Sequence, residues 1–275
     1  MTIARALAAA TSLGLDRLDA QLLLLHALGR PPAERAWLLA HDGDELAPAD
    51  AQHYEQICAR RTGGEPLAYI VGQKEFFGLE LKVDPRVLVP RPETETLVNW
   101  ALELSRALMA PRVIDLGTGS GAIALAIKKT CPHAHVEAVD ASLGALDVAA
   151  TNARALALDV AFGLSSWLTG TTASYDLIVS NPPYVAEADP HLPALKYEPL
   201  HALAAGPDGL DDIRAIVAQA PARLKPNGWL LLEHGWDQAG AVRALLQAAG
   251  FAGVASRRDL AGIERCSGGQ RLELG

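Results

Sequence analysis

The sequence predicts an α/β fold in which a helical bundle precedes a doubly wound, mainly parallel β-sheet. Short apolar strand candidates alternate with helical stretches over residues 93–275, which is the pattern of repeated β-α-β units. One of these strands is followed by the glycine-rich segment Gly117 to Gly121 and then by a helix, as in nucleotide-binding α/β proteins. Residues 1–66 have helical patterning throughout. We therefore predict a helical domain (1–66), a β-hairpin linker (67–92) and a sheet domain (93–275).

Four helices are predicted in the helical domain. Thr2 and Asp16 precede the first two helices, and both residue types favour the N-cap position. Pro31-Pro32 and Pro48 start the third and fourth helices, and Gly63-Gly64 ends the fourth. The second helix has a broad apolar face around Leu22 to Leu25. We interpret this face as the core of a bundle, with a docking surface for a partner as the alternative.

The linker is predicted to form a hairpin. β-Branched and aromatic residues flank Gly78 over residues 75–88, and residues 68–72 also have strand character. Three prolines stiffen the chain that follows, at positions 85, 90 and 92. The next helix is expected to begin near Glu93, with acidic residues at its positive end.

Strand candidates follow one another through the sheet domain, with helices between them. Ligands of such sheets bind beyond the carboxyl ends of the strands. Asp115, Asp140 and Asn181 lie at three such ends, so one pocket can contain all three. The strand candidates contain Val113, Val136, Val160, Leu177, Trp229 and Val254.

The composition excludes several classes of protein. A net charge of −8 disfavours a protein that binds nucleic acid by neutralising phosphates, and no apolar run is long enough for a membrane helix. The three cysteines are far apart and have no metal-ligand or redox spacing. We expect buried thiols, no metal, and a cytoplasmic monomer without a stable nucleic-acid or membrane partner. The alanine-rich start of the chain is interpreted as a helix rather than a signal peptide.

The turn Asn181-Pro182-Pro183-Tyr184 follows the apolar run Tyr175 to Ser180. Its prolines fix φ and remove two N–H donors, which leaves a rigid turn with free carbonyl oxygens. The side-chain oxygen of Asn181 and the carbonyl of Pro182 can each accept one N–H, and the Tyr184 ring can lie against a planar group. The turn therefore suits a planar group that carries an NH₂, and an ordinary turn is the alternative.

Glycines at 117, 119 and 121 have the spacing G-x-G-x-G. This spacing is neither the dinucleotide fingerprint nor a phosphate-binding loop, so a nicotinamide dehydrogenase is disfavoured. Glycines allow the backbone to approach a ligand closely. Asp140, about 20 residues further on, can bind ribose hydroxyls or can cap the helix that follows.

These motifs together resemble the class I methyltransferases that use S-adenosylmethionine, and more narrowly the peptide-chain-release-factor glutamine methyltransferase family. The resemblance covers nearly the whole chain, and the Pro-Arg-Pro-Glu-Thr-Glu segment is its most discriminating part. The motifs that carry it are Phe76-Phe77-Gly78, Leu88-Val89-Pro90-Arg91-Pro92-Glu93-Thr94-Glu95, Asp115 to Gly121, Ser180 to Val185, Glu198-Pro199-Leu200 and Leu232-Glu233-His234-Gly235.

The resemblance implies a Rossmann-like sheet and methylation of the glutamine side-chain nitrogen (N5) in the Gly-Gly-Gln motif of class 1 release factors. The cofactor would be S-adenosylmethionine, with S-adenosylhomocysteine as the product. Asn181, Pro182 and Tyr184 would be catalytic, and Pro183 would join them in binding the substrate. The cofactor would contact Asp115, Gly117, Thr118, Gly119, Ser120, Gly121, Asp140, Trp167 and Asn181.

Several of these residues have plainer interpretations. Trp167 could be a core tryptophan rather than a neighbour of the adenine. Arg91 and Glu95 could be a surface charge and a helix cap. His234 is interpreted as a hydrogen-bonded structural histidine rather than a general base. The chain's own Gly268-Gly269-Gln270 falls in the expected last strand, and we interpret it as a chance match to the substrate motif.

Two other functions remain open from the sequence. The first is an enzyme that methylates the amino group of a nucleic-acid base, since the same turn would hold a flipped base. The second is a non-catalytic nucleotide-binding protein that uses the helical domain for docking. The acidic charge argues against the first, and the intact turn argues against the second.

Overall fold

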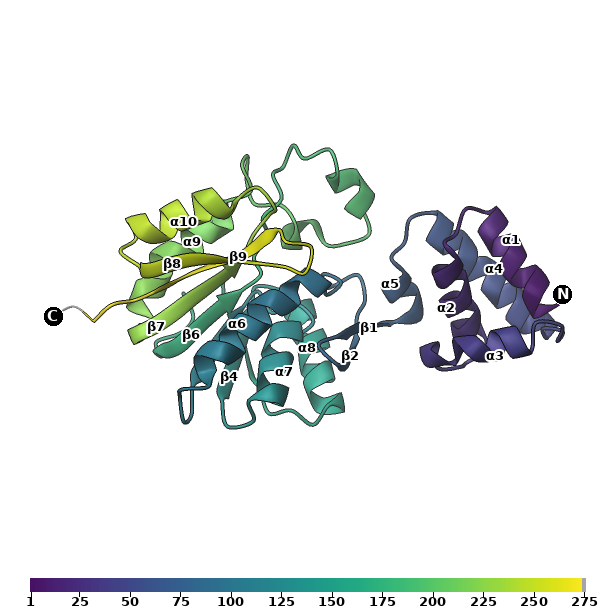
Figure 1. Cartoon of the computed structure of the whole chain (residues 1–275), viewed down its shortest axis with the longest axis horizontal. Helices are drawn as coiled ribbons and strands as arrows, with labels where there is room; N and C mark the ends of the chain where they lie inside the picture. The colour runs from purple at the N-terminus through teal and green to yellow at the C-terminus, as the bar shows by residue number, and fades with distance from the viewer. Residues whose placement is uncertain (274–275) are drawn as a thin grey trace. The chain divides into compact units, whose positions relative to one another are not determined.

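The computed structural model describes residues 1–273, which form two compact units. The first unit is Met1–Gln73, and the second begins at Lys74 (Figure 1). Each unit has its own apolar core.

The first unit is a helical bundle. Thr2 accepts a hydrogen bond from the backbone N–H of Arg5, and Asp16 accepts one from that of Leu18, so both predicted N-caps are confirmed. Leu23, Leu24 and Leu25 are fully buried, which confirms that the leucine face is core. Its helices are α1 (Ile3–Ser12), α2 (Arg17–Ala27), α3 (Arg35–Ala40), α4 (Pro48–Thr62) and α5 (Leu67–Val71), with a 3₁₀ turn at Pro32–Glu34.

The strand character predicted for residues 68–72 is wrong, because this segment is the short helix α5. Ile70 is buried in the core of the first unit, and a helical turn brings Ala68 and Tyr69 into buried positions as well. Gly72 ends the helix with φ of +76°, a conformation that glycine adopts at little cost. Burial against the bundle has overridden the local β-propensity.

The predicted hairpin is present as β1 (Gln73–Phe76) and β2 (Leu79–Lys82). Its two turn residues, Phe77 and Gly78, both have positive φ, as two-residue hairpin turns require. Leu79 and Leu81 are buried in the core of the second unit, while Glu80 and Lys82, which alternate with them, are exposed.

The second unit is built on one seven-stranded sheet, with the strand order β5-β4-β3-β6-β7-β9-β8. The first five strands are parallel, and β9 runs antiparallel to both of its neighbours. The strands are β3 (Arg112–Leu116), β4 (His135–Asp140), β5 (Ala161–Leu164), β6 (Tyr175–Ser180), β7 (Leu224–Glu233), β8 (Ala252–Arg258) and β9 (Glu264–Gln270). This is the predicted mainly parallel sheet.

Helices supply apolar side chains to two separate cores of this sheet. One core contains side chains from α6 (Glu95–Ser105), α7 (Ala122–Thr130) and the hairpin, and the other contains side chains from α9 (Asp211–Gln219) and α10 (Ala239–Ala248). The remaining helices are α8 (Leu143–Ala155) and 3₁₀ turns at Pro92–Thr94, Leu192–Leu195, Leu200–Ala202 and Ala220–Ala222. A helix follows each of β3, β4, β6 and β7, which confirms the predicted alternation of strands and helices.

The Gly268-Gly269-Gln270 tripeptide lies in β9, between β7 and β8. A Cβ atom on Gly268 would come within 2.5 Å of a Leu231 methyl and 3.0 Å of the Trp100 ring. Packing between Trp100 and the sheet therefore requires glycine here. Because the strand is paired on both sides, it is a structural element rather than a substrate loop.

The three cysteines are buried and free, as predicted. Within the described residues, no helix is both long and apolar enough to cross a membrane.

Candidate active site

A cavity of about 270 Å³ opens where β3, β4 and β6 end. Its walls come from the glycine-rich loop, from the residues after β4, β5 and β6, and from the segment that joins the hairpin to α6. The predicted site residues that line it are Gly117, Thr118, Gly119, Ser120, Asp140, Trp167, Asn181 and Pro183. Asp115, Gly121, Pro182 and Tyr184 lie outside this lining.

The glycine-rich loop is held against the end of β4. The backbone N–H groups of Gly117 and Thr118 both donate to the carbonyl of Val139, and that of Gly119 donates to the Asp140 carboxylate at 2.9 Å. Gly117 has φ of +67°, and a Cβ atom there would lie 3.2 Å from the Trp167 ring. Glycine therefore allows both the turn and the close approach of the ring.

Asp140 lines the cavity, but it does not cap α8. Ser142 is the N-cap, because its hydroxyl accepts from the backbone N–H of Ala145. Asp140 instead accepts from the backbone N–H groups of Gly119 and Ser142, one at each carboxylate oxygen. A carboxylate has about four acceptor positions, so further positions can serve a ligand in the cavity.

Asp115 is fully buried beneath the loop. One oxygen accepts from the Thr118 hydroxyl at 2.7 Å and from the backbone N–H of Ala124, while its Oδ1 has no hydrogen-bond partner among the described residues. Burial raises its pKa to about 7, against the opposing effect of the Thr118 bond. In this structure Asp115 holds the glycine-rich loop through these hydrogen bonds. Its predicted contact with the cofactor stays a prediction.

Trp167 stands on the cavity wall with φ of +51°, a conformation that is uncommon for a bulky residue. Asp212 also lines the cavity, and burial raises the pKa of its carboxyl. Trp167 is thus a cavity residue that also packs against the core.

Asn181 brings its side chain to the cavity from the end of β6. Its Nδ2 donates to the Thr94 hydroxyl at 3.3 Å, which leaves Oδ1 as the acceptor for a ligand. No backbone N–H of the described residues donates to the carbonyl of Pro182. Tyr184 is directed elsewhere: its ring packs against the core and its hydroxyl donates to Glu233 at 3.5 Å.

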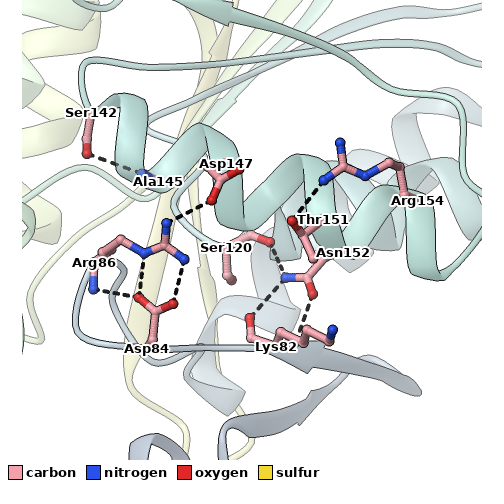
Figure 2. Close-up of polar contacts among 10 residues, drawn as sticks. All are labelled: Lys82, Asp84, Arg86, Ser120, Ser142, Ala145, Asp147, Thr151, Asn152 and Arg154. Carbon is pink, nitrogen blue, oxygen red and sulfur yellow. Dashed lines mark hydrogen bonds and ion pairs between the residues drawn. The ribbon is translucent and has the colours of Figure 1, made fainter.

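The hairpin segment is fastened to α8 and to the glycine-rich loop (Figure 2). The amide of Asn152 bonds to both backbone groups of Lys82 and to the carbonyl of Ser120. Figure 2 also shows Arg86, a cavity residue, with its guanidinium group between the carboxylates of Asp84 and Asp147. These contacts hold the cavity wall that leads to Arg91.

Arg91 and Glu95 have more specific contacts than a surface charge or a helix cap. Arg91 is paired with the buried carboxylate of Glu198, which also accepts from the backbone N–H of Val89. Glu95 accepts from the backbone N–H of Phe77 in the hairpin turn. Both residues therefore tie chain segments together around the site.

His234 is fully buried and hydrogen-bonded at both ring nitrogens, to Ser267 and to the carbonyl of Gly235. Burial lowers its pKa. This confirms the prediction of a structural histidine.

Known relatives are similar to this chain over nearly their full length. The chain is 52% identical over 260 residues to the release factor glutamine methyltransferase of Bordetella pertussis, covering 93% of this chain and 95% of that protein. It is 50% identical over 267 residues to that of Burkholderia pseudomallei, covering 93% and 92%. Family models of the methyltransferase small domain and the PrmC N-terminal domain match residues 95–196 and 2–72.

The chain belongs to the release factor glutamine methyltransferase family. It is a methyltransferase, and the predicted relationship is confirmed.

Solved methyltransferases share the fold at low sequence identity. A methyltransferase from Pyrococcus furiosus matches with a TM-score of 0.56 at 16% identity, covering 78% of this chain and all of that one. The 16S rRNA N2 G1207 methyltransferase of Thermus thermophilus, solved with AdoMet and guanosine, matches with a TM-score of 0.55 at 21% identity, covering 72% and 49%. These matches confirm the class I methyltransferase fold.

Four residues near the site had no assigned role in the sequence analysis: Thr94, Glu198, Asp212 and Glu233. Three of them lie in segments that carry the family resemblance, so the motifs contained the signal without indicating the contacts. Asp212 is outside those segments, and only its place in the cavity lining identifies it.

Proposed function

We propose that this methyltransferase transfers a methyl group from S-adenosylmethionine to the side-chain nitrogen (N5) of the glutamine in the Gly-Gly-Gln motif of class 1 release factors. The observation that carries the proposal is the Asn181 amide, which lines the cavity with its nitrogen bound to Thr94. The names of the relatives support the same substrate class. We expect the reaction to take place in the cytoplasm, where release factors act.

The cavity fits a nucleoside that carries a positive charge. Asp140 would accept from ribose hydroxyls, the Trp167 ring would cover the base, and the backbone of Gly117 to Ser120 would pass close to the amino-acid part. The unpartnered oxygen of buried Asp115 suits an amino group reached directly or through water. When bound, S-adenosylmethionine supplies an electrophilic methyl group on a sulfonium sulfur.

The protein's own contribution is to orient a weak nucleophile. An amide nitrogen is a poor nucleophile because its lone pair is delocalised into the carbonyl. Oδ1 of Asn181 and the carbonyl of Pro182 would each accept one N–H of the substrate amide, which directs the face of the nitrogen towards the methyl group. Positive charge that develops on the nitrogen would strengthen both bonds, so they stabilise the transition state more than the ground state.

The predicted contact of Tyr184 with the substrate amide stays a proposal. Its ring is partly buried against the core, so only the exposed part of the ring is available to stack on a substrate. Burial, and then its acidic neighbour Glu233, raise the pKa of the Tyr184 phenol, which therefore acts as a hydrogen-bond donor and not as a base.

Methyl transfer from labelled S-adenosylmethionine to purified release factor tests the proposal. Label should appear in the wild-type factor and be absent from a factor with Gln→Ala in its Gly-Gly-Gln motif. Equal labelling of both factors would contradict the proposed site of methylation. Labelling of RNA or DNA in place of the factor would support the alternative of a nucleobase methyltransferase.

A further inference from the structure

Glu198 lies in the loop between β6 and α9, and the proposed mechanism does not use it. Only 2% of its side chain is exposed. Oε2 accepts from the backbone N–H of Val89 at 3.1 Å, and Oε1 accepts from the guanidinium group of Arg91. Charge-assisted bonds of this kind are stronger than neutral ones and fix geometry. One buried carboxylate therefore joins the loop after β6 to the segment before α6, which lies 107 to 109 residues away in the sequence.

The segment that Glu198 holds leads directly to the side chain of Asn181. Arg91 precedes the 3₁₀ turn Pro92–Thr94, and the Arg91 carbonyl accepts from the backbone N–H of Thr94. The Thr94 hydroxyl in turn accepts from Nδ2 of Asn181 at 3.3 Å. The position of Arg91 therefore determines where the partner of the Asn181 amide lies.

The chain that follows Glu198 holds the backbone of the same substrate-binding turn. Residues 200–202 form a 3₁₀ turn. The carbonyl of Leu203, the next residue, accepts from the backbone N–H groups of Tyr184 at 3.1 Å and Val185 at 2.8 Å. Glu198 thus lies between two short paths, one to the amide of the turn and one to its backbone.

We infer that Glu198 is a positioning residue for methyl transfer, which acts through its pair with Arg91. The pair fixes the side chain of Asn181 relative to the backbone at Tyr184, because each belongs to one of the two joined segments. A nitrogen and a methyl group react only within a narrow range of distance and direction, so a small displacement lowers the rate. This inference rests on the proposed function.

The first test is Glu198→Leu, which removes both acceptors. It should lower kcat on release factor by roughly 10- to 100-fold, the scale of a misplaced reacting group. The dissociation constant for S-adenosylmethionine should change less than about threefold, since Asp140 and the glycine-rich loop keep their contacts. Glu103→Leu, which removes the exposed partner of Arg257, is the matched control and should keep kcat. Unchanged kcat in Glu198→Leu, or an equal loss of cofactor affinity, would overturn the inference.

A second set of variants separates positioning from stability. Arg91→Met leaves the Glu198 carboxylate buried without its charged partner, so melting temperature and kcat should both fall. Adding Glu198→Gln removes the unpaired charge and keeps an acceptor for the N–H of Val89. The double variant Arg91→Met/Glu198→Gln should therefore regain melting temperature without regaining kcat. Recovery of both together would mean that the pair acts only through stability, against the inference.

A measurement without substrate or cofactor reports whether Glu198 holds the loop. Lys196 is an exposed trypsin site two residues before Glu198, in a part of the loop where backbone hydrogen bonds join near neighbours, such as Glu198 and Leu195. Loss of a charge-assisted bond should raise the open population, and with it the rate of cleavage after Lys196, by roughly tenfold or more in Glu198→Leu. Glu103→Leu should be cut as slowly as wild type.

Mass spectrometry identifies this cleavage by the fragments 1–196 and 197–275, and Lys196→Gln in the same background should abolish them. Equal cleavage after Lys196 in wild type and Glu198→Leu would overturn the inference. If the wild-type enzyme fails to label release factor, the proposed function fails, and the cleavage rates still test whether Glu198 holds the loop.

Discussion

At the scale of single residues, the site depends on polar side chains that are held by other side chains. Asn181 is oriented by Thr94, which lies 87 residues away in the sequence. Asp140 is held by two backbone N–H groups. Such preorganisation reduces the rearrangement needed when the ligands bind.

Asn181→Ala should lower the rate of methyl transfer to release factor by roughly 10²–10³, because the substrate amide loses an acceptor that strengthens in the transition state. Cofactor affinity should change little. Single-turnover kinetics and calorimetry measure the two quantities. Asn99→Ala, an exposed asparagine on α6, is the matched control, and near-normal turnover of Asn181→Ala would contradict the proposed mechanism.

Asp140→Ala should weaken the binding of S-adenosylmethionine by about 1.5–3 kcal/mol, the contribution of a hydrogen bond to a charged group. The loss of support for Gly119 acts in the same direction. Calorimetry should show this for Asp140→Ala and not for Asp159→Ala, an exposed acid between α8 and β5 that does not line the cavity. Equal affinities for both variants would limit Asp140 to a structural role.

The pH dependence of stability should report the burial of Glu233. Burial raises its pKa from an ordinary 4.5 to about 7, so the folded state retains the proton over this range while the unfolded state releases it. The contribution to stability therefore falls as pH rises from about 4.5 to about 7, by at most about 3 kcal/mol at 1.36 kcal/mol per pKa unit.

Glu233→Gln removes this titration. Without ligands, the melting temperature of Glu233→Gln relative to wild type should increase between pH 5 and pH 8. Glu80→Gln, which changes an exposed glutamate of β2, should show no such trend. A pH-independent difference for Glu233→Gln would mean that Glu233 ionises as an ordinary carboxyl.

At the scale of elements, the hairpin and α8 form one wall of the cavity through a few buried polar contacts. Asn152 is 1% exposed. Its side-chain amide forms hydrogen bonds with both backbone groups of Lys82 in β2 and with the backbone carbonyl of Ser120 in the glycine-rich loop. The segment that carries Arg86 and Arg91 therefore follows a strand that is anchored to a helix.

Asn152→Ala should destabilise the second unit by about 1–3 kcal/mol, because it leaves buried backbone groups of Lys82 and Ser120 without partners. Denaturant unfolding measures this change. Cofactor affinity should also fall, since Ser120 lines the cavity. The neighbouring Thr151→Ala removes only an exposed contact with Arg154 and is the control; a similar loss in both variants would argue against the anchoring role.

At the scale of the whole molecule, the chemistry and the helical bundle belong to different compact units. Every residue that lines the cavity lies in the second unit, and the bundle has a core of its own. A unit with its own core can fold independently. We propose that the first unit recognises the release factor.

Removal of residues 1–71, which ends before β1, should leave a folded protein that binds S-adenosylmethionine with near-normal affinity. Methylation of whole release factor should fall much more than methylation of a short Gly-Gly-Gln peptide, because only the former uses the bundle for positioning. Initial rates on both substrates give the comparison. If the truncated protein treats whole factor as the full chain does, the bundle is not a recognition unit.

Periodicity, caps and turn residues determined most of the fold from the sequence alone. The N-caps Thr2 and Asp16, the hairpin at Gly78 and the alternation of strands and helices are local features that neighbouring residues specify. The prediction failed at residues 68–72, because burial of Ile70 in the bundle outweighed the local β-propensity. The strand ends likewise indicated Asp140 and Asn181 as residues of one pocket, whereas Asp115, predicted with them, is buried outside its lining.

Only the tertiary structure decided how those residues are held and what supports them. The contacts of Asn181 with Thr94, of Arg91 with Glu198, and of Tyr184 with Glu233 join segments between 49 and 107 residues apart. No local pattern encodes such pairs, because they form only when segments distant in sequence pack together around the carboxyl edge of the sheet. Burial of Glu233 and Asp115 is a property of that packed edge, so their raised pKa values follow from the fold rather than from the motifs.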